Sequence, residues 1–312
     1  MRICRLGWLF ATVSFFTLGN SIAVGHPNVI EAYGDSLTAG FLSGTSLTAP
    51  PPNRGVTADD LSISKLLHDM LLYRITGDTS LLVPEHWPQL AWPQVLSELE
   101  QTSSHAISVH NEAISGAEIK DLMGQVQGAP VNRRKTQAFF YIGHNDLCNT
   151  SMTPDEQAQS YYEQYAAALQ YWDQNHQNSE AILVPLLDLS RVFTLLDGYV
   201  WYKGPEATYD CDFSWTRLFP YCPSYLPMYK KGELPGYVQP RVEAMNQELH
   251  TLAEQMEEKS TGSNHFSVLD HVYDQQFSPD YFAVDCYHLS AVGQQTIATT
   301  FKTLLDAQGG HL

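Results

Sequence analysis

Four groups of polar residues in this sequence stand directly after apolar segments. Each group combines small, flexible or ionisable residues. The groups are Gly34-Asp35-Ser36, Asn111 with Gly116, Gly143-His144-Asn145-Asp146, and Asp285 with His288. A serine hydroxyl is a weak nucleophile that needs an adjacent base. Among the 12 histidines, His288 is the best candidate for that base, because Asp285 lies three residues earlier and can orient its imidazole. The residue types therefore predict nucleophilic catalysis with Ser36 as nucleophile.

The elements that would position these groups follow from the apolar patterns. Continuous apolar segments predict buried strands within residues 28–34, 106–113, 138–143, 181–189 and 265–270. Helical patterns cover residues 154–174, 238–259 and 289–308. This alternation predicts an α/β fold, a three-layer α/β/α sandwich with a mostly parallel five-stranded sheet. Ligands bind at the carboxyl ends of such strands, so we expect the four polar groups to converge at one edge of the sheet.

The same groups form a series of sequence blocks. They read GDSL at 34–37, N-x-x-x-S-G at 111–116, G-x-N-D at 143–146 and D-x-x-H at 285–288, followed by the C-terminal helical pattern. GDSL alone recurs by chance, but the four blocks in this order resemble the GDSL esterase/lipase family, also called the SGNH hydrolases. The resemblance covers most of the chain. It implies a flavodoxin-like SGNH hydrolase fold, a Ser–His–Asp triad and an oxyanion hole with three donors.

The oxyanion donors can be assigned to positions in this chain. Backbone N–H groups of Ser36 and Gly116, with the side-chain amide of Asn145, would stabilise the anion of a tetrahedral intermediate. Purely structural roles are the alternatives. Ser36 or His288 would then cap a helix, Gly116 would be a turn glycine, and Asn145 with Asp146 would form an Asx turn.

Two of the blocks indicate a subgroup. The third block continues as GHNDLC, and the last reads DCYHLSAVGQ. Both are similar to the phospholipase B-like branch of the family, which implies acyl esters of phospholipids or lysophospholipids as substrates. The alternatives are a short-chain or carbohydrate acetyl esterase that uses the same triad, and a non-catalytic secreted binding protein. The mechanism requires no metal or organic cofactor, and the sequence has no H-E-x-x-H cluster.

The N-terminus is typical of a secretory signal peptide. Arg2 and Arg5 precede an apolar segment over 6–18, and small residues follow up to Gly25. An uncleaved anchor is the alternative, but the segment is shorter than the roughly 20 residues that span a bilayer. We therefore expect a signal peptide over 1–25, no integral membrane segment after its removal, and a secreted or periplasmic protein. The net charge of −17 disfavours binding to nucleic acid.

The remaining chain, 26–312, is predicted to be a single SGNH hydrolase domain with two loop-rich insertions. The first lies near 43–92 and includes a short helical pattern at 61–72. The second lies near 190–236 and is rich in Tyr, Trp and Pro. It would form part of an acyl-chain pocket or lid, or simply a loop wrapped on the core.

Four cysteines follow the signal segment: Cys148, Cys211, Cys222 and Cys286. An even number in an exported protein predicts two disulfides, and four cysteines allow three pairings. The short spacing between Cys211 and Cys222 favours a bond between them, and hence one between Cys148 and Cys286. The second bond would tie the oxyanion loop, which carries Asn145, to the triad loop, which carries Asp285 and His288. Four free buried thiols are the alternative. The cysteines lack C-x-x-C spacing, so we expect no zinc site.

Overall fold

The computed structural model describes residues 27–43, 87–101, 106–130, 134–203, 208–218, 222–260, 263–274 and 276–308. The expected signal peptide and most of the first insertion, including the helical pattern at 61–72, lie outside the described residues. Within the described ranges no helix is both long enough and apolar enough to cross a membrane.

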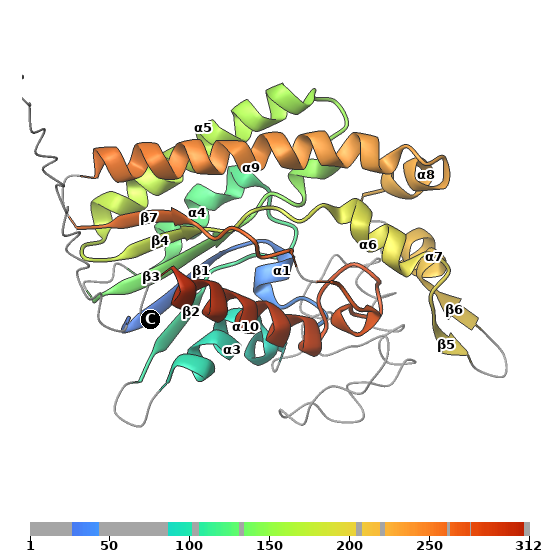
Figure 1. Ribbon diagram of the computed structural model, residues 1–312, viewed down its shortest axis with the longest axis horizontal. Coiled ribbons are helices and arrows are strands. Elements are labelled where there is room, and N and C mark those ends of the chain that lie inside the picture. The colour runs from blue at the N-terminus through green and yellow to red at the C-terminus, as the bar shows by residue number, and fades with distance from the viewer. Residues whose placement is uncertain are drawn as a thin grey trace, which may run out of the picture.

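A five-stranded parallel sheet forms the centre of the molecule (Figure 1). Its order is β2-β1-β3-β4-β7, and every neighbouring pair is parallel. The strands are β1 (Val29–Gly34), β2 (Ser108–Asn111), β3 (Thr136–Tyr141), β4 (Glu180–Leu183) and β7 (His265–Val268). The predicted fold class is therefore confirmed, with each strand inside or overlapping an expected segment.

Helices cover both faces of the sheet (Figure 1). One face carries α4 (Leu122–Gly128), α5 (Pro154–Asn175) and α9 (Leu234–Lys259), and the other carries α3 (Trp92–Glu100) and α10 (Ala291–Ala307). Neighbouring residues of β3 show why both faces need cover. The Phe139 ring stacks 5.7 Å from Phe301 of α10, whereas the Phe140 ring lies 6.0 Å from Trp172 of α5. Both faces of this strand are apolar, as its continuous apolar sequence predicts.

The helix boundaries follow local capping signals. At the start of α5, Thr153 and Glu156 form a capping box and Pro154 occupies the first turn. At the start of α10, the Ser290 hydroxyl accepts a hydrogen bond from the Gly293 N–H at 3.2 Å. Helix α9 begins four residues earlier than its pattern predicts, at Leu234, and contains Pro240 within its first turns.

The expected strand at 181–189 is shorter than predicted. Strand β4 ends at Leu183, and Pro185, which has no N–H to donate to a ladder, follows soon after. Asp188 then accepts a hydrogen bond from the Ser190 N–H at 2.9 Å and caps a new helix, α6 (Leu189–Leu196).

The second insertion is more regular than a loop. Beyond α6 it contains a hairpin of β5 (Val200–Lys203) and β6 (Thr208–Asp210), and then α7 (Cys211–Phe213), the π-helical turn η5 (Ser214–Leu218) and α8 (Tyr225–Lys230). Figure 1 shows these elements beyond the carboxyl ends of the strands. At the border of the first insertion, the short helix η2 (Trp87–Leu90) leads into α3, whose Trp92 is fully buried in the core.

The four cysteines form two disulfides, as expected, but the predicted pairing is wrong. The bonds join Cys148 to Cys222 and Cys211 to Cys286, with Cα separations of 5.1 and 5.5 Å. Cys211 and Cys222 are separated along the chain by α7 and η5, and each bonds to a different loop of the main domain. Both bridges thus attach the insertion to loops at the carboxyl edge of the sheet.

Candidate active site

The structure brings Ser36, Asp285 and His288 together at the carboxyl edge of the sheet. The Ser36 Oγ atom lies 2.7 Å from Nε2 of His288, and Nδ1 of His288 lies 2.5 Å from Oδ2 of Asp285. Because Nδ1 faces a carboxylate, it carries the ring proton, and Nε2 is left to accept the serine proton. All three side chains are buried. This is the arrangement that activates a serine hydroxyl.

The position of Ser36 follows from the end of β1. Asp35 caps the short helix α1 (Ser36–Ala39) by accepting the Leu37 N–H at 3.0 Å. Gly34 packs so closely against the Tyr141 carbonyl and the Thr38 side chain that a Cβ atom would clash with both. The Gln125 amide also binds both the N–H and the carbonyl of Gly34, each at 2.8 Å.

A tight loop presents the histidine. Its ends are closed by a hydrogen bond from the Ala283 N–H to the His288 carbonyl at 2.8 Å. Inside the loop, Oδ1 of Asp285 accepts the backbone N–H groups of Tyr287 at 3.1 Å and His288 at 3.0 Å. One carboxylate oxygen therefore shapes the loop while the other orients the imidazole.

The three predicted oxyanion donors lie around the same edge. Among the described residues, the N–H groups of Ser36 and Gly116 have no acceptor. Gly116 has a φ of +83°, which favours glycine. The Asn145 amide donates one hydrogen to the Ala117 carbonyl at 2.9 Å, and an amide group carries two. Each of the three groups thus keeps an N–H that no acceptor among the described residues takes up, as the prediction requires.

His144, to which the sequence assigned no role, links three parts of the site. Its Nδ1 lies 3.1 Å from Oδ2 of Asp35, and its Nε2 accepts the Leu187 N–H at 3.1 Å. Both Asp35 and His144 are buried. Since Nε2 accepts, the ring proton lies on Nδ1 and is donated to Asp35. The imidazole therefore joins the turn that carries Ser36 to the loop that carries Asn145 and to the segment after β4.

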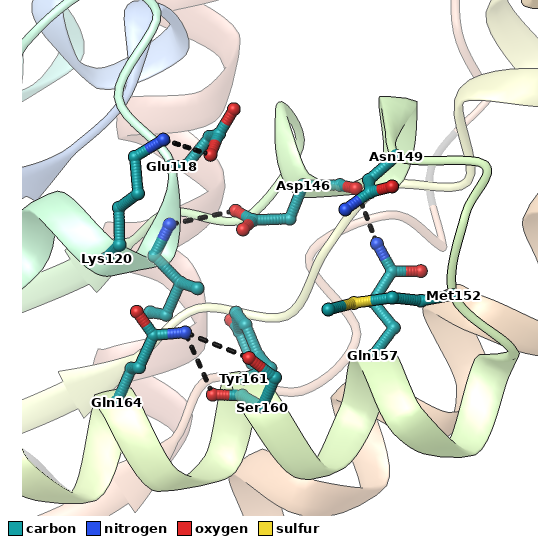
Figure 2. A pocket seen from close by; sticks show the side chains of 10 residues that line it. Glu118, Lys120, Asp146, Asn149, Met152, Gln157, Ser160, Tyr161 and Gln164 are labelled. Atoms are coloured by element: carbon teal, nitrogen blue, oxygen red, sulfur yellow. Dashed lines mark hydrogen bonds and ion pairs between the residues drawn. The ribbon is translucent and has the colours of Figure 1, made fainter.

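Asp146 reaches from the oxyanion loop into a cavity of about 280 Å³ between α5 and the short helix η3 (Ile119–Asp121), as Figure 2 shows. Its carboxylate accepts the Ile119 N–H at 2.9 Å. Burial raises the pKa of Asp146 to about 7, and the charges of Glu118 and Asp35 add to the shift, although the Ile119 hydrogen bond opposes it. This carboxyl group thus titrates near neutral pH while it holds η3 beside Asn145.

A second cavity, of about 510 Å³, lies beside Gly116 and is lined in part by Ile114, Lys120 and Gln125. The large apolar residue Ile114 is 57% exposed. Its backbone N–H donates to the Gly34 carbonyl at 3.1 Å, so this loop runs alongside the end of β1. Space and apolar surface are therefore present next to the predicted oxyanion donors.

Further side chains hold the backbone of the site, and the sequence assigned no such role to them. Gln294 of α10 accepts the Trp92 N–H at 2.9 Å and donates to the Leu37 carbonyl at 3.1 Å. Asn111, at the start of the second block, donates to the Thr38 carbonyl at 3.0 Å.

In the part of the chain that the structure describes, no cluster of three or more His, Cys, Asp or Glu could hold a metal ion.

Comparisons with solved structures find lipases and esterases of low sequence identity. An extracellular lipase from Streptomyces rimosus is 13% identical, with 90% of this chain and 99% of the lipase covered and a TM-score of 0.46. Phospholipase A1 from Streptomyces albidoflavus NA297 is 12% identical, with 90% and 99% covered and a TM-score of 0.46. A mutant of Axe2, an acetyl-xylooligosaccharide esterase from Geobacillus, is 15% identical, with 91% and 96% covered and a TM-score of 0.45.

The sequence itself matches a family model. A search of curated protein sequences found no significant match. The model described as GDSL-like Lipase/Acylhydrolase, however, matches residues 30–301. That range begins in β1 and ends in α10, and it includes all four sequence blocks. The chain therefore belongs to the GDSL-like lipase/acylhydrolase family, as the blocks predicted.

Proposed function

We propose that this member of the family is an exported serine hydrolase that cleaves carboxylic esters through an acyl-enzyme. Ser36 is the nucleophile, His288 the general base and then the general acid, and Asp285 the carboxylate that orients His288. The observation that carries the proposal is the unbroken hydrogen-bond chain from Ser36 Oγ to His288 at 2.7 Å and on to Asp285 at 2.5 Å.

The reaction follows from this chain. Ser36 Oγ attacks the ester carbonyl carbon while Nε2 of His288 takes the hydroxyl proton. The N–H groups of Ser36 and Gly116 and the Asn145 amide stabilise the tetrahedral oxyanion. His288 then gives its proton to the departing alcohol, and the acyl group remains on Ser36. Water, deprotonated by His288, attacks the acyl-enzyme and releases the carboxylic acid.

For the substrate, we propose acyl esters of phospholipids or lysophospholipids. The resemblance of the GHNDLC and DCYH segments to the phospholipase B-like branch supports this class. The exposed Ile114 beside Gly116 offers apolar surface for an acyl chain next to the oxyanion donors. Lys120 lines the same cavity, and its ammonium group, which pairs with Glu118 at 2.7 Å, would exchange this partner for a phosphate group.

Export is part of the proposal. The segment 1–25 has the features of a signal peptide, and the two disulfides are typical of proteins from oxidising compartments. N-terminal sequencing of the protein recovered from culture medium or periplasm is expected to begin near residue 26. An N-terminus at Met1 in an exported fraction would contradict the signal assignment.

The substrate test is the release of free fatty acid from lysophosphatidylcholine by the wild type, with Ser36→Ala as the blank. Release by the wild type alone supports both the nucleophile and the lipid class. Release from acetylated xylooligosaccharides but not from lysophosphatidylcholine would keep the mechanism and replace the lipid class. Equal release by both variants would overturn the assignment of Ser36.

A further inference from the structure

Three interactions between described residues join the second insertion, near 190–236, to Val284 and Cys286 in the triad loop, the loop that carries Asp285 and His288. A disulfide joins Cys211 to Cys286. The indole N–H of Trp215 donates to the Cys286 carbonyl at 3.1 Å, and the Ser214 hydroxyl donates to the Val284 carbonyl at 3.0 Å. These contacts lie on both sides of Asp285 in the sequence. The insertion therefore holds the backbone that carries the triad carboxylate.

The triad loop needs such support. Cys286 has a φ of +60°, a left-handed conformation that is strained for a residue with a Cβ atom. It is also fully buried, so its carbonyl requires a protein partner. Trp215 supplies that partner. Without the indole N–H, the peptide between Cys286 and Tyr287 would lose a hydrogen bond that fixes its orientation, directly between Asp285 and His288.

The supporting groups are themselves fixed. The Trp215 ring stacks on Phe193 of α6 with 4.3 Å between centroids, and the Ser214 hydroxyl accepts the Trp201 indole N–H at 3.1 Å. The second disulfide joins Cys222 to Cys148, three residues after Asn145. The insertion is thus bonded both to the triad loop and to the end of the oxyanion loop.

We propose that Trp215 and Ser214 are positioning residues for the Asp285–His288 pair, and that the insertion braces the catalytic loops rather than acting as a mobile lid. This inference rests on the proposed function, because it assumes that His288 activates Ser36. Misplacing a reacting group by about 1 Å can lower a rate by as much as about 100-fold. Since neither residue is placed on the substrate, we expect a change in kcat and little change in KM.

The main test compares Trp215→Phe with the wild type. Phenylalanine keeps an aromatic ring against Phe193 but removes the N–H donor. We expect kcat for p-nitrophenyl butyrate, and the rate constant for inactivation by a fluorophosphonate, to fall about 10-fold each, with KM within twofold. Ser214→Ala tests the second hydrogen bond and is expected to lower kcat about threefold. It also keeps the proposal testable if Trp215→Phe fails to fold.

Trp172→Phe is the matched control. Trp172 lies near the C-terminal end of α5 and is fully buried, and its indole N–H donates to Glu31 of β1 at 3.3 Å. The same chemical change there removes a buried hydrogen bond but does not touch the triad loop. We expect it to lower the melting temperature and to leave kcat per folded molecule unchanged.

The outcomes separate the brace from the proposed function. A fall in kcat for Trp215→Phe, with no fall for Trp172→Phe, supports the brace. A kcat within twofold of the wild type for both Trp215→Phe and Ser214→Ala overturns it, and so does an equal fall in the control. Failure of the fluorophosphonate to modify Ser36 in the wild type would instead overturn the proposed function on which the brace depends.

Discussion

Replacing His144 by alanine tests whether a buried imidazole holds the nucleophile turn and the oxyanion loop together. The change removes the donor to Asp35 at 3.1 Å and the acceptor of the Leu187 N–H at 3.1 Å. A hydrogen bond to a charged group contributes about 1.5–3 kcal/mol, and an unsatisfied buried donor costs about 1–3 kcal/mol. We therefore expect His144→Ala to lower the free energy of unfolding by about 3–5 kcal/mol.

Two further variants show how much of this loss of stability comes from each of the two hydrogen bonds. The amide of asparagine ends near the place of Nδ1, so His144→Asn can still donate to Asp35 but leaves the Leu187 N–H unpaired. The longer glutamine can place its oxygen near Nε2, so His144→Gln retains the Leu187 contact and loses the one to Asp35. Because the Asp35 contact involves a buried carboxylate, we expect His144→Gln to be the less stable of the two.

The assay is urea unfolding followed by circular dichroism, with kcat measured on the folded protein. His144→Ala is also expected to lower kcat, because Asp35 precedes Ser36 and His144 precedes Asn145 in the chain. A loss of less than about 1 kcal/mol in His144→Ala would refute the reasoning, since it would mean that both buried partners find new ones.

Three other variants give independent checks. Asn145→Ala is expected to lower kcat by about 10²–10³ without unfolding the protein, and an unchanged kcat would remove Asn145 from the oxyanion hole. Burial raises the pKa of Asp146 to about 7, so the folded state binds the carboxyl proton more tightly than the unfolded state does. The stabilisation that comes from binding this proton is lost as pH rises through 7. Asp146→Asn should therefore gain up to about 4 kcal/mol relative to the wild type at pH 8 and gain little at pH 4, as thermal unfolding at both pH values would show. Burial would raise the pKa of Glu31, but the hydrogen bond and charge of His176 outweigh it and hold the pKa below its ordinary value of 4.5. Glu31→Gln should thus cost about 3 kcal/mol at neutral pH, and the difference from the wild type should shrink as pH falls below 4.5; a constant difference in acid titrations would contradict the pairing.

Much of the fold could be predicted because its signals are local. The continuous apolar segments of β1 and β3 indicated strands that are covered on both faces, and Pro154, a residue favoured in the first turn of a helix, marked the start of α5. The four sequence blocks indicated the residues at the carboxyl edge, because in a parallel sheet the polar residues after each strand must meet there.

The errors arose where the outcome depends on contacts between distant segments. The disulfide prediction used the short spacing between Cys211 and Cys222. Cys211 instead pairs with a partner 75 residues away, and Cys222 with one 74 residues away. Gln125 and Gln294 are ordinary helix residues in the sequence, and their roles follow only from packing against Gly34 and Leu37. His144 is the unspecified residue of the G-x-N-D block, so only the folded chain shows that it meets Asp35.

The central claim is that Ser36, activated by His288, forms the acyl-enzyme. The most direct measurement is intact and peptide mass spectrometry after reaction with a fluorophosphonate, for the wild type and for Ser36→Ala and His288→Ala. We predict a single adduct on Ser36 in the wild type, none in Ser36→Ala, and labelling slowed by at least about 10³-fold in His288→Ala. An adduct on another serine, or equally fast labelling of Ser36 without His288, would contradict the account.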